Sequence, residues 1–213
     1  PYGYSRQVLS GGFGFASKNG SYLAFDVTRA DKDDMRFAGA PLDTRDLDVT
    51  SYQLRSHLVL DHPIFKAFRL SATWMDFDRK NDNFSYRALV GAPALAIFDR
   101  KVGAAQAMLD GKTGAWDWTL GFALRHDQRD ATRYQGATFA AQSPVIADGA
   151  VTSYGLTAEG VYALAAGSRI KVGARLDFVR ASLDGMDRNG MTTPGVGVTP
   201  TPRRLFAATY GYA

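Results

Sequence analysis

The residue types that carry most enzyme and metal chemistry are scarce in this sequence. It has no cysteine, which excludes disulfides, thiolate metal sites and cysteine nucleophiles. Its three histidines are His57, His62 and His126. They fall on different expected strands or turns, so we do not expect them to converge on one metal ion. His57 is expected among charged neighbours, His62 in a short turn, and His126 at an interface.

Two groups of side chains are weak candidates for metal binding. Met35, Met186 and Met191 carry thioethers, which suit soft metal ions. The aspartates of the segment 31–34 could hold a hard cation such as Ca²⁺. Ordinary packing in a loop, or a solvated loop, explains both groups more simply.

Patterns for catalysis and nucleic-acid binding are missing. The sequence has no Gly-x-Ser-x-Gly nucleophile elbow. Ser56 and His57 are adjacent, so they face opposite sides of a strand and cannot act as a pair. The net charge of +4 is spread along the chain without a basic stripe. We therefore expect no enzymatic activity, no cofactor and no nucleic-acid partner.

Charged side chains instead alternate with apolar ones over long segments. Residues 116 to 127 are the clearest example, because every second residue from Trp116 to Leu124 is apolar. This alternation is typical of a β-strand with one apolar and one wet face. We expect the charged set to line a watered lumen, where it would bind a plug through ion pairs or steer cargo. The set is Arg55, His57, Arg69, Asp117, Arg125, Asp127, Glu159, Lys171, Arg175 and Asp177.

The apolar positions of the same segments are expected to face lipid. They are Leu54, Leu58, Phe68, Leu70, Trp74, Trp116, Trp118, Leu120, Phe122, Leu156, Ile170, Val172, Leu176 and Phe178. A small soluble barrel would also alternate, but aromatic residues near the expected strand ends favour lipid, since they suit interfacial girdles. These aromatics are Tyr22, Tyr52, Trp74, Trp116, Tyr154 and Tyr162.

Strand length and loop length point the same way. The alternation predicts about nine strands of about 10 to 14 residues, which is longer than strands of soluble proteins and sufficient for a tilted membrane crossing. Long polar connections are expected at about 31–48, 79–95, 129–149 and 183–203, and short turns between them. No apolar run is long enough for a membrane helix, so any membrane-spanning structure must be a barrel. The prediction is an all-β, antiparallel up-and-down transmembrane β-barrel portion with alternating short turns and long loops.

The sequence resembles TonB-dependent outer-membrane receptors, and within them the copper-receptor branch. The resemblance is carried by Asp33–Asp43, by Trp74–Asp78, by Asp82-Asn83-Phe84, by Leu124–Asp127 and by Gly173–Asp177. It covers most of the chain. It implies a bacterial outer-membrane location, lipid as a partner, and import of a metal ion or metal chelate. It also implies a plug domain and the TonB energy-coupling complex as partners.

The resemblance also implies what this chain lacks. Such receptors have plugged barrels of about 22 strands. Residues 1–213 are therefore expected to be a partial barrel without a plug domain or a closing C-terminal strand. Copper receptors carry a His-x-Met pair of copper ligands where this sequence has Arg79 and Asn81. A guanidinium is always charged and has no lone pair to donate, so we do not expect copper at this position.

Two other interpretations remain open. A small passive porin or structural barrel would be complete, with an even number of strands and its edges paired. A soluble β-sandwich binding module would have strands of about six residues and apolar side chains that meet inside.

Overall fold

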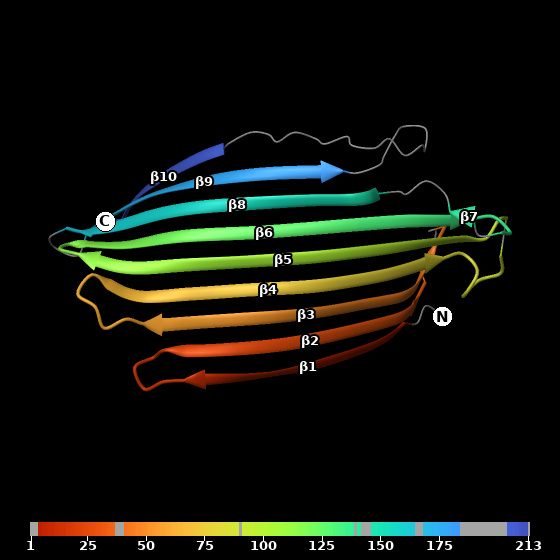
Figure 1. Ribbon diagram of the computed structural model, residues 1–213, viewed down its shortest axis with the longest axis horizontal. Coiled ribbons are helices and arrows are strands. Elements are labelled where there is room, and N and C mark those ends of the chain that lie inside the picture. Colours follow the sequence, from red (N-terminus) through yellow and green to blue (C-terminus); the bar gives the residue numbers. More distant parts are fainter. Residues whose placement is uncertain are drawn as a thin grey trace.

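The computed structural model describes residues 4–36, 41–89, 91–138, 140–141, 146–164, 168–183 and 204–212. These residues form one antiparallel sheet in which the long strands follow one another in sequence order, and the short β7 pairs with β6 (Figure 1). The predicted all-β, up-and-down fold is confirmed. The strands are β1 (Ser5–Ala16), β2 (Tyr22–Met35), β3 (Asp43–Val59), β4 (Phe65–Asp82), β5 (Ala94–Thr113), β6 (Trp116–Gln135), β7 (Ala140–Ala141), β8 (Ile146–Ala163), β9 (Arg169–Leu183) and β10 (Arg204–Tyr212).

The described part of the chain is a single layer. β5 and β6 are each 20 residues long, several times the length usual in soluble proteins. The buried apolar side chains of the sheet are small ones. No second sheet packs against it in the described residues. The soluble β-sandwich interpretation is therefore wrong. No helix within these ranges has the length and hydropathy needed to cross a membrane.

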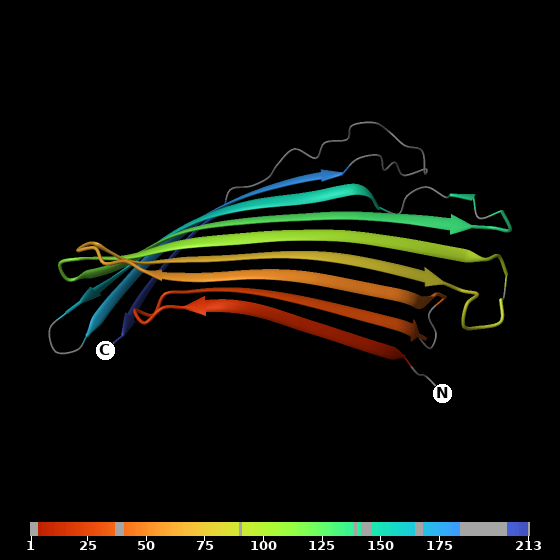
Figure 2. The ribbon, with the colours of Figure 1, turned by 60° about the horizontal axis from the view of Figure 1, so that its bottom comes forward.

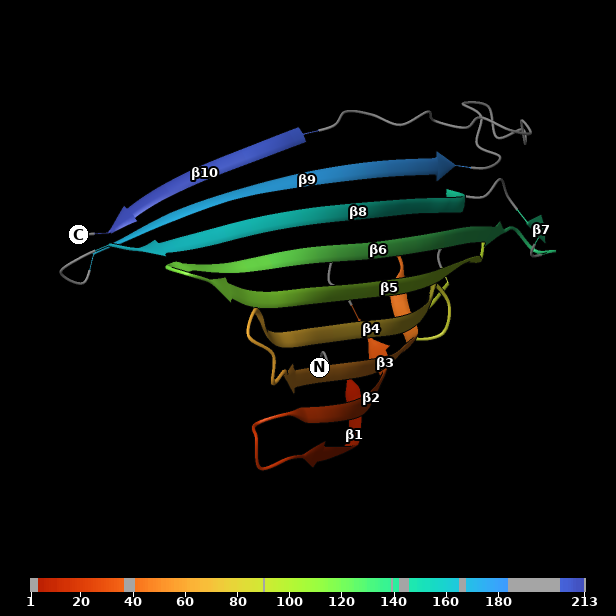
Figure 3. The same ribbon diagram turned by 60° about the vertical axis from the view of Figure 1, so that its left-hand side comes forward.

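The sheet is curled across its strands and is not closed. Figures 2 and 3 show the curl, with β1 and β2 turned away from the plane of the later strands. β1 and β10 are the two edges, and each pairs on one side only within the described residues. β1, β3, β5 and β8 end at one end of the sheet, and β2, β4, β6 and β9 end at the other (Figure 1). Fewer residues separate successive strands at the first end, as between β5 and β6, than at the second, as between β4 and β5.

The first hairpin shows why the short connections form where the sequence predicts them. Ser17 N donates to Ser21 O at 2.8 Å, and Gly20 N donates to Ser17 O at 3.0 Å. Gly20 has a φ of 87°, which a residue with a Cβ adopts only with strain. The Asn-Gly pair of this turn is a strong hairpin signal for that reason.

The strands run further toward the long-loop end than the sequence pattern predicts. β2 continues to Met35, β4 to Asp82 and β6 to Gln135, so much of the segments expected as loops at 31–48, 79–95 and 129–149 is strand. The expectation failed because both faces of the sheet are polar there, which removes the alternation. Backbone hydrogen bonds hold the strands together whatever the side chains are.

The register divides the sheet into an apolar face and a polar face. Every residue predicted to face lipid lies on the apolar face; on β6 this face carries Trp116, Trp118, Leu120 and Phe122. Leu120 is 50% exposed although it sits in the middle of the apolar run of β6 from Trp116 to Leu124. On β5 and β6 the buried apolar residues lie on the polar face; they are Ala94, Ala96, Val102 and Ala131. Because side chains converge on the inside of a curl, this burial indicates that the polar face is the inner one.

The apolar face ends abruptly toward the long-loop end. The apolar residues of β6 from Trp116 to Leu124 span about 26 Å along the strand, or about 20 Å across a bilayer at a usual tilt of about 40°. Beyond them a row of directly paired aspartates crosses the same face, one on each of strands β2 to β6. We call this row the aspartate ladder. It consists of Asp31, Asp48, Asp78, Asp99 and Asp130.

One aromatic residue departs from the predicted girdle. Tyr22 is paired with His57 and so lies on the polar face, where the two rings meet at 5.8 Å. Tyr52, Trp74, Trp116, Tyr154 and Tyr162 lie on the apolar face.

Candidate functional site on the polar face

The residues predicted to line a lumen all lie on the polar face. Most are already paired with an opposite charge on the same or a neighbouring strand. The pairs that join single cations to single carboxylates are Arg55–Asp26 (2.7 Å), Arg69–Asp110 (2.7 Å), Lys112–Asp117 (3.5 Å), Lys171–Glu159 (2.8 Å) and Arg175–Asp177 (2.8 Å). Sequence reasoning found one member of some pairs and missed Asp26, Asp110 and Lys112.

The histidines are far from forming a common site. His57 is on the polar face opposite Arg69 of β4. His62 lies in the β3–β4 connection, where its Nδ1 accepts hydrogen bonds from the backbone N–H groups of Ile64 and Phe65, both at 3.2 Å. His126 lies on the apolar face and its Nδ1 is 2.8 Å from Thr152 Oγ1. Each ring therefore has a local structural partner.

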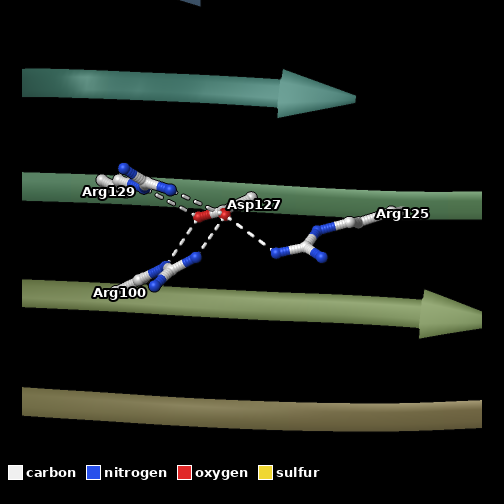
Figure 4. Close-up of polar contacts among 4 residues, drawn as sticks. All are labelled: Arg100, Arg125, Asp127 and Arg129. Carbon is white, nitrogen blue, oxygen red and sulfur yellow. Dashed lines mark hydrogen bonds and ion pairs between the residues drawn. The ribbon is translucent and has the colours of Figure 1, made fainter. Parts of the chain in front are cut away.

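Asp127 accepts hydrogen bonds from three arginines on this face (Figure 4). Arg100 reaches its two oxygens at 2.9 and 2.6 Å, and Arg129 reaches both at 3.0 Å. A third guanidinium, from Arg125, approaches only to 3.5 Å. The Asp127 side chain is 7% exposed, so the carboxylate is buried under the arginines that bind it. Two forked guanidiniums use all four acceptor sites of a carboxylate.

This cluster has more positive than negative charge. Arg100 and Arg129 are directly opposite each other in the register, an arrangement that repels unless an anion lies between them. Sequence reasoning missed both, because β6 was expected to end at residue 127 and β5 was only weakly predicted. The signal was present in the parity of the strand, since Arg129 follows Asp127 by two residues and so shares its face.

A hollow of about 330 Å³ adjoins the cluster on the polar face. Its floor is made of small residues such as Ala104 and Ala123, and the forks of Arg125 and Arg175 stand at its sides. Hydroxyl groups from Ser71, Thr73 and Ser153 also line it. Hydroxyls and guanidiniums together are hydrogen-bond donors suited to oxyanions.

The end of β4 carries the positions that the copper-receptor resemblance singled out. Arg79 Nε donates to Asn81 Oδ1 at 2.8 Å, and Arg79 Nη2 donates to Thr44 Oγ1 at 2.9 Å. Both acceptors are neutral, and Arg79 forms no ion pair within the described ranges. These side chains therefore build a donor-rich surface and do not supply soft ligands.

The connection between β4 and β5 is folded back onto the start of β3. Arg87 forms an ion pair with the buried carboxylate of Asp43, with Nε 2.7 Å from Oδ2. Asp82 Oδ1 accepts from the backbone N–H of Ser85 at 2.9 Å. Burial, and then a hydrogen bond to Asp34, raise the pKa of Tyr86 to about 12. This connection is thus held by specific polar contacts, which its polar composition alone did not reveal.

The structure does not support the candidate metal-binding residues. Met35 ends β2 opposite Thr44, and Met186 and Met191 lie outside the described residues. Among the described residues, no group of three or more His, Cys, Asp or Glu side chains is arranged to hold a metal ion.

The fold is similar to that of a solved transporter. No protein-family model matches the chain, and no curated protein matches it either. Among solved structures, the chain is similar to "Copper transporter OprC", with a TM-score of 0.74 and 17% sequence identity. The match covers 98% of this chain and 33% of that chain, so this chain spans about a third of the length of that transporter. At this identity the similarity shows the fold alone, which is that of a segment of its structure.

Proposed function

We propose that this chain is part of the wall of an outer-membrane transport barrel of the TonB-dependent receptor class. The observation that carries the proposal is the division of the long strands into an apolar and a polar face. The apolar face would contact lipid over a band about 20 Å high, close to the height of roughly 25 Å that is usual for such barrels. The polar face would line the interior, with its ion pairs and hydroxyls in water.

The cargo we propose is a metal ion or a metal chelate. The structural similarity to a copper transporter supports this class of cargo. Arg79 and Asn81 argue against direct copper ligation at that position, because neither supplies a thioether or an imidazole. In such a receptor a plug would fill the interior, and the TonB energy-coupling complex would drive its movement. No catalytic step is proposed.

Uptake in living cells tests this function. Cells lacking the gene should accumulate less of at least one metal from a panel supplied alone and as chelates, measured by mass spectrometry of washed cells. Loss of TonB in otherwise normal cells should cause the same defect. Uptake that is unsaturable and independent of TonB would favour the alternative, a small passive porin or structural barrel.

A further inference from the structure

We propose that the hollow beside Arg125 is a binding site for a small oxyanion, one that carries carboxylate or phosphate groups. The proposal rests on the proposed function only in one respect: if the chain is a transport barrel, the cargo would be an anionic chelate and not a bare metal cation. The binding site itself is argued from the contacts of the polar face.

The hollow lies beside a cluster of arginines. Away from the hollow, the ion pairs of the polar face join one cation to one carboxylate. Around the hollow, four arginines face two carboxylates. They are Arg100, Arg125, Arg129 and Arg175, with Asp127 and Asp177. These four guanidiniums and two carboxylates leave a local excess of positive charge beside the hollow.

The guanidinium of Arg125 has hydrogen-bond donors that can bind an anion. The carboxylate of Asp127 is already saturated by Arg100 and Arg129, and Arg125 touches it only at 3.5 Å, which is at the limit of a hydrogen bond. The Arg125 side chain is 56% exposed. Its donors thus point into accessible space, with no other partner among the residues that the structure describes.

The floor of the hollow leaves room for an anion between polar groups. The register places Thr73, Ala104, Arg125 and Ser153 side by side on β4, β5, β6 and β8. Ala104 leaves open space between the hydroxyl of Thr73 and the guanidinium of Arg125. The side-chain hydroxyls of Thr73 and Ser153 have no hydrogen-bond partner among the described residues, so both can bind a ligand.

An ion pair forms the opposite side of the hollow. Arg175 donates from Nε and Nη2 to Asp177 at 2.8 Å. This pair lies against Gly155, where an added Cβ would stand 2.8 Å from Asp177 Oδ1 and 3.0 Å from Arg175 Nη2. A glycine is therefore needed for the pair to lie flat on the wall. An anion that enters would meet the ion-paired guanidinium of Arg175 on one side and the exposed guanidinium of Arg125 on the other.

The volume of about 330 Å³ fits a small molecule, since it lies at the lower end of known ligand pockets. An acidic segment of protein would cover a larger surface and would not need the small-residue floor. A small oxyanion is therefore the occupant that the geometry favours.

Calorimetric titration tests the site with citrate and with inorganic phosphate as probes, each at low ionic strength. The protein is used as its cells make it, extracted in mild detergent. We expect Arg125→Gln to weaken citrate binding at least tenfold, and Arg125→Lys to weaken it less, because it keeps the charge but loses the fork. Lys112→Gln is the matched control: it removes one half-exposed cation (54%) from the same face at its turn end, and affinity should stay within about twofold.

Ser153→Val provides a second, gentler variant that leaves every charge in place and should weaken citrate binding about threefold or more. Equal affinity of the wild-type and Arg125→Gln proteins, or an equal loss with Lys112→Gln, would overturn the site. So would the absence of any binding of either probe by the wild-type protein, or binding only of an acidic peptide. Metal uptake is a separate measurement, so loss of uptake with intact citrate binding would contradict the proposed function and leave this site standing.

Discussion

Asp127 shows how a single carboxylate can hold neighbouring strands together on a wet face. It binds Arg100 of β5 and Arg129 of its own strand through two hydrogen bonds each. Its side chain is nearly buried, although those of the two arginines are 33% and 52% exposed. The interaction is therefore only partly screened by water, unlike a surface ion pair.

Replacing Asp127 with Asn should destabilise the folded protein by about 2 kcal/mol, because two arginines would remain directly opposed with no anion between them. Urea-induced unfolding in lipid vesicles, followed by tryptophan fluorescence, measures this change. Asp26→Asn is the control: its pair with Arg55 is about half exposed on both sides, and its loss should cost less than about 0.5 kcal/mol. Equal losses for the two variants would show that burial of Asp127 has no energetic weight.

Tyr86 reports on the folding of the β4–β5 connection. Its phenol is partly buried and hydrogen-bonded to Asp34, which raises its pKa to about 12. Since the raised pKa favours the protonated form in the folded connection, the stabilisation is complete below about pH 10, the pKa of a free tyrosine. It is lost as the pH rises from about 10 to about 12.

Ultraviolet titration of the wild-type protein and of Tyr86→Phe isolates this one phenol. The difference between the two curves should have its midpoint near pH 12. A midpoint near 10 would mean that the connection does not cover Tyr86.

At the scale of the strand, β6 carries the clearest division between the two faces. Leu120 is exposed on the apolar face, and replacing it with Arg should cost roughly 2 to 4 kcal/mol if it sits near the bilayer midplane. Thr119→Arg on the polar face of the same strand is the control, because Thr119 is directly opposite Asp110 of β5 and Glu159 of β8 and so places the new charge between two opposite ones. Folding titrations in lipid vesicles measure both variants. Full tolerance of Leu120→Arg in a folded barrel would contradict the lipid-facing assignment.

The sequence predicted the two faces of the strands but not their full length. Within the apolar band, side chains such as Trp118 and Leu120 reveal the alternation, because a face that contacts lipid or a core must be apolar. Beyond the band, Asp78, Arg79 and Lys80 are polar on both faces, so the period of two vanishes although the backbone ladder continues. The ion-pair partners of the predicted charged residues could not be predicted either, because they depend on the register between strands, which a single sequence does not show.

The aspartate ladder could not be predicted for the same reason, because it depends on the register between strands. It makes the long-loop ends of the strands electrostatically unfavourable. Like charges directly opposite each other destabilise a sheet, and Asp99 has such a neighbour on both sides, Asp78 and Asp130. Asp99→Asn should therefore stabilise the protein by about 0.5 to 1 kcal/mol at low ionic strength, and by less in high salt.

Asp130 is the terminal member of the aspartate ladder, since a register shift separates it from β8. Asp130→Asn should give about half the gain of Asp99→Asn in the same denaturation measurement. A destabilised Asp99→Asn protein would mean that the ladder is held by a favourable interaction that outweighs its repulsion.

For the molecule as a whole, the apolar face of the open sheet requires a cover. A single-layer sheet has no dry interior to drive folding in water, so its apolar side must be covered by something else. The exposed leucines and aromatics of this face extend from β1 to β9, a far larger area than soluble monomers leave uncovered. Lipid is the cover that the proposed function supplies.

The three tryptophans test this orientation directly, because Trp74, Trp116 and Trp118 all lie on the apolar face. Trp116 and Trp118 are at the turn end of the band, and Trp74 is at its other end, two residues before Asp76. In vesicles of lipids brominated at known depths, a variant that keeps only Trp74 and one that keeps only Trp116 should both be quenched most by shallow bromines. A Leu120→Trp variant in a tryptophan-free background should instead be quenched most by deep bromines, because its strand position is mid-band. Equal quenching of the three by water-soluble iodide alone, with no effect of brominated lipid, would mean that the apolar face meets protein or water and not a bilayer.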